Sequence, residues 1–161
     1  MMQNPPARIR IATDADAAPL LAMMRLFHAG ENARLDRERL RGSLAELVTD
    51  ARLGRVLIAE AGAEPLGYAV VTFGFDLAVG GRDASLTELY VRPTARRRGL
   101  GALLLAEVER AALAAGARHL RLSVFPENEP AFTLYRSRGF QTPPRVPLSK
   151  ALTTAATDAP R

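Results

Sequence analysis

Residues 86–101 read LTELYVRPTARRRGLG, and this stretch decides the fold. Its first part, Leu86 to Val91, is rich in aliphatic, β-branched and aromatic residues and predicts a strand. Pro93 ends that strand, because proline cannot donate a hydrogen bond to a sheet. Apolar residues then recur at helical spacing from Leu100 to Ala115 and predict a helix. The order is therefore strand, turn, helix, with arginines and glycines in the turn.

The turn has the features of a phosphate-binding site. The first turn of a helix leaves backbone N–H groups unpaired and carries partial positive charge, so it attracts phosphate. Gly99 and Gly101 lack the Cβ atoms that would keep a diphosphate away from these groups. We expect one or two of Arg96, Arg97 and Arg98 to reach phosphate oxygens. The alternative is a plain strand–helix connection with a solvated basic surface.

A second cluster lies further along the chain, where residues 128–140 read NEPAFTLYRSRGF. Glu129 to Arg138 is predicted to form a short helix, and Asn128 is its predicted N-cap. The cluster ends in Gly139-Phe140, which follows a tyrosine at position 135.

The rest of the chain divides into short strands and amphipathic helices. The predicted order is strand Arg8–Ile11, a helix from its cap Thr13 to Gly30, a helix from its cap Asp36 to Val48, strands Arg55–Ala61, Leu66–Asp76 and Leu86–Arg92, the helix Leu100–Ala115 closed by Gly116, strand His119–Phe125, helix Glu129–Arg138 and a proline-broken strand Gln141–Leu148. This order predicts an α/β protein with an antiparallel first half and a parallel βαβ unit in the second.

Composition bounds the organisation and the chemistry. The 161 residues suit one domain, predicted over residues 8–150 between a flexible N-terminus (1–7) and a disordered tail (151–161). The chain has no cysteine, which excludes a disulfide framework and a thiol nucleophile. Its two histidines are far apart in sequence, so we expect no metal. No signal peptide or membrane span is evident, and the expected location is cytoplasmic.

The net charge of +5 raises the question of nucleic acid as a partner. Nearly all of the positive charge is arginine, and Lys150 is the single lysine. The arginines are spread along the chain and do not alternate with aromatic residues that would stack on bases. We therefore do not expect nucleic acid to be the principal partner.

The two motifs together resemble the Gcn5-related N-acetyltransferase (GNAT) superfamily, over about residues 8–150. The family's phosphate motif, Gln/Arg-x-x-Gly-x-Gly/Ala, is matched by Arg96, Gly99 and Gly101. Its later motif is matched by Asn128, Ala131, Tyr135 and Gly139-Phe140. Within the superfamily, Asn128-Glu129-Pro130 and Phe73-x-Phe75-Asp76 are similar to the diamine (spermidine/spermine) acetyltransferases. The resemblance implies a mixed, splayed sheet of roughly six to seven strands, flanked by about four helices.

The resemblance also implies a place for acetyl-CoA, between the splayed strands that contain Leu86–Val91 and Leu120–Phe125. The pantetheine arm would pair with the strand backbone, and the turn would hold the diphosphate. The implied cofactor-binding residues are Leu89, Tyr90, Val91, Arg96, Arg97, Arg98, Gly99, Leu100, Gly101, Ala102, Asn128 and Ala131. Many relatives are homodimers, often through the final strands, and Pro143-Pro144-Arg145-Val146-Pro147 leaves the mode open here.

Amine acetylation needs a base and a modest acid. An alkylammonium has a pKa of about 10 and must lose a proton, and the leaving thiol has a pKa of roughly 8.5. Tyr135 is the predicted acid, because the family places a tyrosine beside the CoA sulfur. Glu88 is the predicted base, just before the point where the family's strand bulges. In diamine acetyltransferases the proposed base is one position earlier, which is Thr87 here. Both residues have a purely structural alternative, as a packed tyrosine and a surface glutamate.

The acceptor is predicted less closely than the cofactor. His28 and Asp76 are the predicted substrate-binding residues, with ordinary capping or surface roles as the alternative, and Glu31, Asp36 and Glu38 would add negative charge. A small polyamine or diamine is the favoured acceptor. A protein α-amine or lysine, an amino acid and an aminoglycoside are the alternatives. From a different class, a non-catalytic acyl-CoA- or nucleic-acid-binding module remains open.

Overall fold

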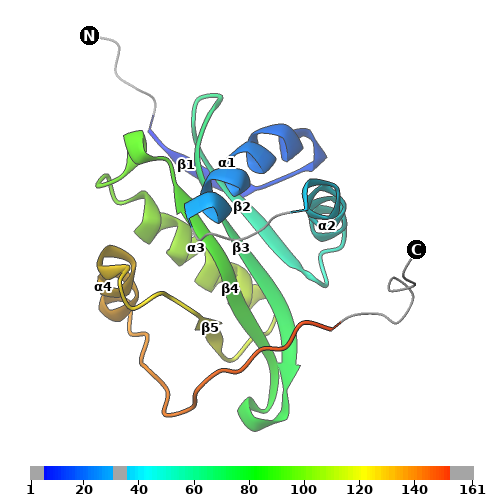
Figure 1. Cartoon of the computed structure of the whole chain (residues 1–161), viewed down its shortest axis with the longest axis vertical. Coiled ribbons are helices and arrows are strands. Elements are labelled where there is room, and N and C mark those ends of the chain that lie inside the picture. The colour runs from blue at the N-terminus through cyan, green and yellow to red at the C-terminus, as the bar shows by residue number, and fades with distance from the viewer. Residues whose placement is uncertain (1–5, 31–35, 153–161) are drawn as a thin grey trace, which may run out of the picture.

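The structure is a computed structural model that describes residues 6–30 and 36–152. Its centre is a five-stranded sheet in the order β1-β2-β3-β4-β5 (Figure 1). The strands are β1 (Arg8–Ile11), β2 (Gly54–Ala61), β3 (Glu64–Asp76), β4 (Gly81–Val91) and β5 (Leu120–Leu122). Strands β1 to β4 pair antiparallel, and β5 pairs parallel to β4. The predicted α/β class and the mixed sheet are therefore confirmed.

Helices cover both faces of this sheet (Figure 1). They are α1 (Ala17–Gly30), α2 (Arg37–Thr49), α3 (Leu100–Ala114) and α4 (Glu129–Ser137). Leu104, Leu105 and Val108 of α3 are fully buried on one face, against alternate residues of β2, β3 and β4. Leu20 and Met23 of α1 are fully buried on the other face. The alternation along each strand thus divides the core into two layers, one on each side of the sheet.

Local signals in the sequence set the helix ends. Asp36 caps α2, since its carboxylate accepts hydrogen bonds from the backbone N–H groups of Glu38 (3.0 Å) and Arg39 (3.2 Å). Helix α1 ends at Gly30, and Gly116 follows α3 with a φ of 81°. The predicted helix boundaries are confirmed to within two residues, except that a short 3-10 turn, Asp14–Asp16, precedes α1.

The C-terminal part of the sheet is smaller than expected. The predicted strand Gln141–Leu148 is wrong, because residues 141–148 form no strand within the described part of the chain. Three prolines in this segment, Pro143, Pro144 and Pro147, lack the N–H group that a sheet needs. Strand β5 is also shorter than the predicted His119–Phe125. The sheet therefore has five strands rather than six or seven. The predicted flexible N-terminus and disordered tail fall mainly on residues 1–5 and 153–161, outside the described residues.

An ion-pair network fixes the N-terminal edge of the sheet. The Arg10 guanidinium contacts Asp16 at 2.7 Å and Glu60 at 2.9 Å, and Arg8 also pairs with Glu60. Both carboxylates are buried, with whole-residue exposures of 8% for Asp16 and 5% for Glu60. Hydrogen bonds from Arg10 hold the pKa of Asp16 and of Glu60 below their usual range, although burial alone would raise them. The network joins β1, β2 and the start of α1.

Substitution Arg10→Met should lower the free energy of unfolding by about 2–3 kcal/mol at neutral pH, because it leaves two buried carboxylates short of a partner. Chemical denaturation measures this loss. Lowered carboxyl pKa values stabilise the fold above the unfolded-state values of about 4, and that contribution disappears as the pH falls below them. The difference in the free energy of unfolding between the wild type and the variant should consequently become smaller as the pH falls toward about 3.

Arg52→Met is the matched control, since Arg52 pairs with Asp50 while its own side chain is 86% exposed. Arg52→Met should lower the free energy of unfolding by clearly less than Arg10→Met does, and this loss should depend less on pH. Equal losses for the two variants would show that the Arg10 network adds nothing beyond an ordinary surface pair.

Candidate active site

Strand β4 contains a bulge at Thr87. Val70 of β3 pairs with Glu88, whereas the next residue, Val71, pairs with Leu86, so Thr87 is the extra residue in the register. A bulge of this kind breaks the alternation of side chains along a strand. Leu86 consequently packs on the α3 face, while Glu88 lies on the α1 face.

The resemblance places Glu88 just before the bulge, and the structure instead has the bulge at the residue that precedes Glu88. Thr87 itself is exposed, and its hydroxyl donates to the Val70 carbonyl at 3.3 Å. The carboxylate nearest the bulge is therefore that of Glu88.

Glu88 is held from two other elements. One carboxylate oxygen, Oε1, lies 2.9 Å from Nε2 of His28 at the end of α1. The other, Oε2, accepts a hydrogen bond of 2.6 Å from the Tyr68 hydroxyl on β3. The Glu88 and His28 side chains are 16% and 19% exposed, and Tyr68 is fully buried. The structure thus brings together two predicted site residues, His28 and Glu88.

Tyr68 is the member of this group that sequence analysis missed. It lies in an apolar run that predicts a buried strand, and nothing in that run marks its hydroxyl as special. The signal becomes visible only with the β3–β4 register, which pairs Tyr68 with Tyr90 and Val70 with Glu88. In this register Tyr68 lies two positions before Val70, which pairs with Glu88, so the buried Tyr68 hydroxyl and the Glu88 carboxylate are close neighbours. A buried hydroxyl usually has a hydrogen-bond partner, and this carboxylate is the nearest candidate.

Strand β5 covers only part of β4. Its pairing begins at Ala84 with Leu120 and ends at Leu86 with Leu122, whereas β4 continues to Val91. The stretch Leu89–Val91 therefore has no strand on its β5 side within the described residues, although the Val91 carbonyl accepts a hydrogen bond from the Arg96 side chain. This is the segment that the resemblance assigns to the pantetheine arm.

The turn after β4 has two residues with left-handed backbone. Arg97 has a φ of 61° and is the single non-glycine residue with positive φ in the described chain, and Gly99, the N-cap of α3, has a φ of 78°. Such a conformation costs a non-glycine residue about 1 kcal/mol or more, and it is found most often at functional sites. The first turn of α3, with Leu100 buried beneath it, directs its unpaired N–H groups outward along the helix axis.

The three arginines of the turn are not equivalent. The Arg96 side chain folds back, and its Nε donates to the carbonyl of Val91 at 2.9 Å. The Arg96 side chain therefore stabilises the end of β4, and it also contributes positive charge near the turn. No comparable contact within the described residues involves Arg97 or Arg98, both of which are exposed.

Helix α4 brings the second motif to the same region. The Asn128 side chain caps α4 by accepting from the Ala131 N–H at 3.3 Å. Gly101 faces α4, where a Cβ atom at this position would lie 3.3 Å from Leu134. Gly101 thus has a packing role in addition to the predicted role at phosphate, and Ala102 beside it is partly buried.

Tyr135 lies on the face of the sheet opposite Glu88. It is 8% exposed, belongs to the core cluster that contains Leu86 and α3, and packs against Phe140 with ring centres 5.7 Å apart. Leu89 and Val91 pack against the same cluster. The two predicted catalytic residues therefore flank β4 from opposite sides.

Asp76 lies at the far end of the β3–β4 hairpin. Its carboxylate accepts from the Ala78 N–H at 2.8 Å and pairs with Arg121 at 2.5 Å, and Arg121 also reaches Asp83 at 2.7 Å. The Ala78 hydrogen bond and then Arg121 lower the pKa of Asp76. Since Asp76 pairs with Gly81, seven positions before Glu88, the two carboxylates are roughly 20 Å apart along the strands. The structure does not bring Asp76 to the His28–Glu88 pair.

The other acidic residues predicted near the acceptor also separate. Asp36 and the backbone of Glu38 are engaged in the cap of α2. Glu31 lies outside the described residues.

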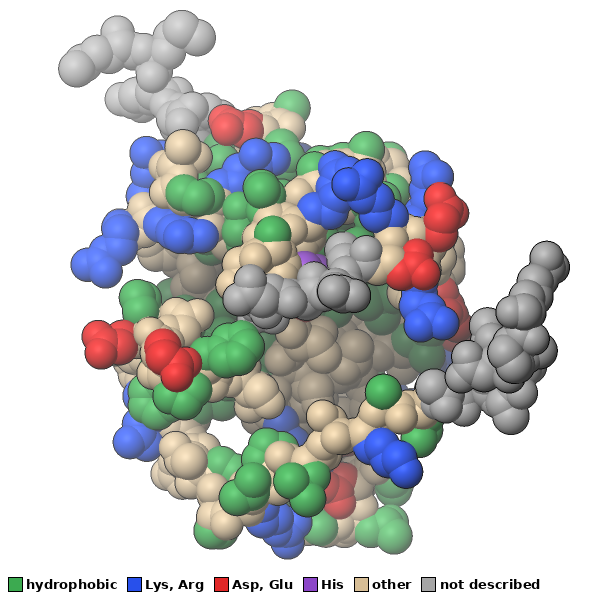
Figure 2. Space-filling model, in the orientation of Figure 1, with side chains coloured by type: hydrophobic (Ala, Val, Ile, Leu, Met, Phe, Trp, Pro, Cys, Tyr) green, Lys and Arg blue, Asp and Glu red, His purple; other side chains and the backbone are tan. Residues whose placement is uncertain are grey.

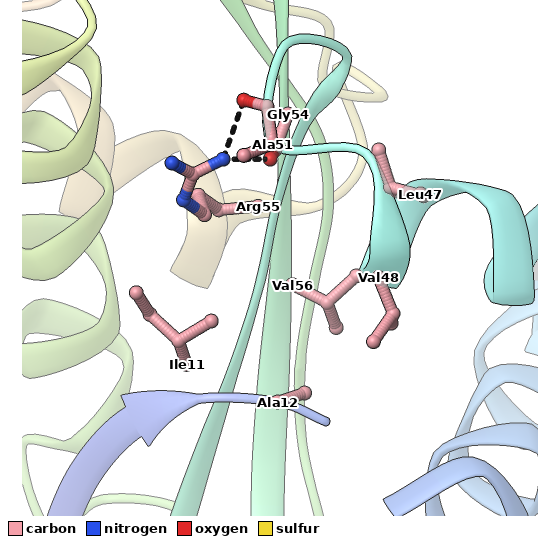
Figure 3. A pocket seen from close by; sticks show the side chains of 8 residues that line it. All are labelled: Ile11, Ala12, Leu47, Val48, Ala51, Gly54, Arg55 and Val56. Carbon is pink, nitrogen blue, oxygen red and sulfur yellow. Dashed lines mark hydrogen bonds between the residues drawn. The ribbon is translucent and has the colours of Figure 1, made fainter. Parts of the chain in front are cut away.

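The face that contains α1 and α2 is hollowed near its centre (Figure 2). The visible floor of this hollow, over β3 and β4, is mostly backbone and uncharged polar side chains. A separate pocket of about 170 Å³ lies between α2 and the β1–β2 edge, lined by Ile11, Ala12, Leu47, Val48, Ala51, Gly54, Arg55 and Val56 (Figure 3). It contains none of the predicted site residues, and Arg55 there is bonded to the carbonyls of Ala51 and Gly54.

Within residues 6–30 and 36–152, no group of three or more His, Asp or Glu side chains is arranged to hold a metal ion. In the same part of the chain, no helix has the length and apolar character that a membrane crossing requires.

Comparison with known proteins supplies the family. A model described as the acetyltransferase (GNAT) family matches residues 20–140. The chain belongs to this family. Among curated proteins, it is 31% identical over 144 residues to a thialysine N-epsilon-acetyltransferase of Bos taurus, covering 83% of each chain. The corresponding protein of Sus scrofa is 29% identical over 142 residues, covering 81% of this chain and 82% of its relative.

Solved structures agree with this assignment. A putative acetyltransferase from Arthrobacter sp. FB24 is 32% identical with a TM-score of 0.76, and the match covers 90% of this chain and 96% of that one. Aminoglycoside N-acetyltransferase AAC(6')-Iy, solved with CoA, has a TM-score of 0.80 at 19% identity, over 94% and 98% of the two chains, and shows the shared fold. The protein is therefore a GNAT-family N-acetyltransferase that uses acetyl-CoA, and the alternative of a non-catalytic module is set aside.

The strained turn generates a prediction on stability. Arg97→Gly should raise the free energy of unfolding by up to about 1 kcal/mol, because glycine adopts positive φ without a Cβ penalty. Arg98→Gly removes the same charge at a residue without positive φ, and it should leave stability unchanged or lower it. Thermal or chemical denaturation of both variants measures the difference. An Arg97→Gly protein no more stable than Arg98→Gly would show that position 97 is not strained.

Proposed function

We propose that this N-acetyltransferase acts on the primary amine of a small molecule, with a diamine or polyamine as the favoured acceptor. The observation that carries the proposal is the Glu88 carboxylate, held beside an open segment of β4 with the predicted acid on the opposite side of that strand. A negative charge at this point attracts an alkylammonium group and offers its proton a destination.

Acetyl-CoA would lie along Leu89–Val91, with its diphosphate at the turn of residues 96–102. Three arginines and the start of α3 supply positive charge there, and Asn128 and Ala131 close the region from α4. A backbone N–H near Leu89 or Tyr90 would polarise the thioester carbonyl. When bound, acetyl-CoA supplies the activated acetyl group, and the amine attacks it directly.

Tyr135 would supply a proton to the leaving thiolate. A phenol is a suitable donor, because its pKa of about 10 lies close to that of a thiol. Asp76 would not contact an acceptor held at Glu88, since it pairs with Gly81, seven positions before Glu88, and its carboxylate is bonded to Arg121. A homodimer and a cytoplasmic location remain predictions from the sequence.

A second candidate acceptor is an amino acid with an amine at the end of its side chain. The curated relatives are named for acetylation of the ε-nitrogen of thialysine, and they match this chain over more than four-fifths of their length. Thialysine, like a diamine, presents a primary alkylamine at the end of a short flexible chain. The two candidates differ in the carboxylate at the other end of the molecule.

Release of CoA thiol from acetyl-CoA, measured with a panel of amines, tests the acceptor. The panel contains spermidine, a short diamine, thialysine, lysine, an N-terminal peptide and an aminoglycoside. We expect release above background with spermidine, the diamine or thialysine. Release with only the peptide or only the aminoglycoside would overturn the proposed acceptor class. If the protein binds acetyl-CoA but none of the amines in the panel supports thiol release, the proposal as a whole is contradicted.

Tyr135→Phe should lower turnover by about ten- to a thousandfold, with little change in acetyl-CoA affinity. The ring of phenylalanine keeps the contact with Phe140, so the variant should fold. Steady-state kinetics and direct titration of acetyl-CoA measure the two quantities. Unchanged turnover would remove Tyr135 from the mechanism.

A further inference from the structure

We infer that His28 is the group that takes the proton from the acceptor's ammonium, at its Nδ1 atom, and that Glu88 orients His28 through Nε2. This inference rests on the proposed function, and it assigns the base of the same site. It changes the role of His28 from substrate binding to proton transfer, and that of Glu88 from base to positioning residue.

The contacts of Glu88 favour His28, and not Glu88, as the group that takes the proton. Both carboxylate oxygens of Glu88 are already engaged, because Oε1 lies 2.9 Å from Nε2 of His28 and Oε2 accepts a hydrogen bond of 2.6 Å from the Tyr68 hydroxyl. Bonds to an ionised carboxylate are stronger than bonds to a neutral group. A proton placed on Glu88 would neutralise the acceptor of both bonds and weaken them together. A proton placed on His28 leaves both bonds intact and adds an opposite charge beside the carboxylate.

The direction of the His28 bond is the second argument. An ionised carboxylate only accepts hydrogen bonds, so in this state Nε2 of His28 must carry the hydrogen. In a neutral imidazole the other nitrogen, Nδ1, then has a free lone pair. In the Ser-His-Asp triad a carboxylate fixes the tautomer of the histidine base through Nδ1–H and leaves Nε2 to take the proton; here Glu88 contacts Nε2, so the two nitrogens exchange these roles.

The surroundings of His28 hold the ring in place. The Phe27 ring packs edge to face against the imidazole of His28, with ring centres 5.2 Å apart. The ring centres of Phe27 and Tyr68 are 6.5 Å apart. His28 also lies in the last turn of α1, so the helix fixes the position of its backbone over the sheet. The side chain keeps 19% of its surface exposed, and the assignment has the acceptor, or one bridging water, approach Nδ1 from this exposed side.

The protons balance as follows. The ammonium R–NH₃⁺ gives one proton to Nδ1, which leaves a free amine and an imidazolium ion paired with Glu88. The amine nitrogen forms its bond to the acetyl carbon, and the carbon–sulfur bond breaks with its electron pair on sulfur. The thiolate takes the Tyr135 proton, the N-protonated amide returns a proton to that phenolate, and His28 releases its own proton to solvent. The products are the amide, CoA thiol and one proton.

His28→Gln separates the two roles of His28. The glutamine amide nitrogen can replace Nε2 as a donor to Glu88, but the side chain has no atom that accepts a proton at neutral pH. We expect kcat to fall by about a hundred- to ten-thousandfold with thialysine or spermidine, while acetyl-CoA affinity stays unchanged. Activity of His28→Gln within about threefold of wild type would overturn the assignment and return the base to Glu88.

Two control variants test whether the loss of activity is specific to His28. His119→Gln changes the other histidine, which is exposed at the start of β5, and should keep wild-type kinetics. Tyr68→Phe removes one bond to Glu88 without touching His28, and it should lower kcat by about tenfold, less than His28→Gln does. A greater loss for Tyr68→Phe than for His28→Gln would also contradict the assignment.

The tautomer can be read without any acceptor. The chain contains two histidines, so ¹⁵N-histidine NMR of the wild-type protein gives two ring systems, and His28→Gln identifies them. We expect neutral His28 to carry its hydrogen on Nε2, and Glu88→Gln to disturb this preference. A hydrogen on Nδ1 would overturn the inference. If no amine were acetylated, the proposed acceptor would fail while this measurement still decided the state of His28.

Discussion

One extra residue in β4 determines the geometry on which the active site depends. Because Thr87 is the extra residue of the bulge, Leu86 faces α3 and Glu88 faces α1, although they are two positions apart in one strand. A regular strand would direct both side chains to the same face. The carboxylate would then lie in the apolar layer around α3, where an isolated charge is costly. The bulge instead places Glu88 within reach of His28 and Tyr68.

The same strand creates the opening for the ligand. Strand β5 leaves β4 after Leu86, close to the bulge, so within the described residues Leu89–Val91 has a neighbouring strand only on its β3 side. The strand then runs into a turn that contains a left-handed arginine and a left-handed glycine. The backbone that we propose for the pantetheine arm and the N–H groups that we propose for the diphosphate thus follow one another along a single continuous segment of chain.

Short-range features were largely predictable from the sequence. Asp36 as a cap, Gly30 and Gly116 as helix ends, and the strand–turn–helix order around Gly99 all depend on residues within one or two turns of each other. The predicted strand Gln141–Leu148 does not form, because three prolines in this segment lack the N–H group that pairing in a sheet requires. The family motifs identified Glu88 and Tyr135 as candidates without indicating that they lie on opposite faces of β4.

The contacts of Glu88 could not be predicted in the same way. His28 is 60 residues and Tyr68 is 20 residues from Glu88 in sequence. Their meeting depends on the β3–β4 register and on the position of α1 over the sheet, and neither is encoded locally. A lone histidine at a helix end and a tyrosine in an apolar strand have ordinary structural explanations. Only their convergence on one carboxylate distinguishes them.

The N-terminal ion network acquires a functional meaning from this convergence. Asp16, held by Arg10 and buried, directly precedes α1, and His28 lies in the last turn of the same helix. A 14-residue helix is a stiff rod of about 21 Å, so the position of its start constrains the position of its end. The buried pairs between β1, β2 and Asp16 therefore help to hold the imidazole against Glu88. The N-terminal edge of the sheet thus helps to position α1, and with it the contact between His28 and Glu88, as well as to stabilise the fold.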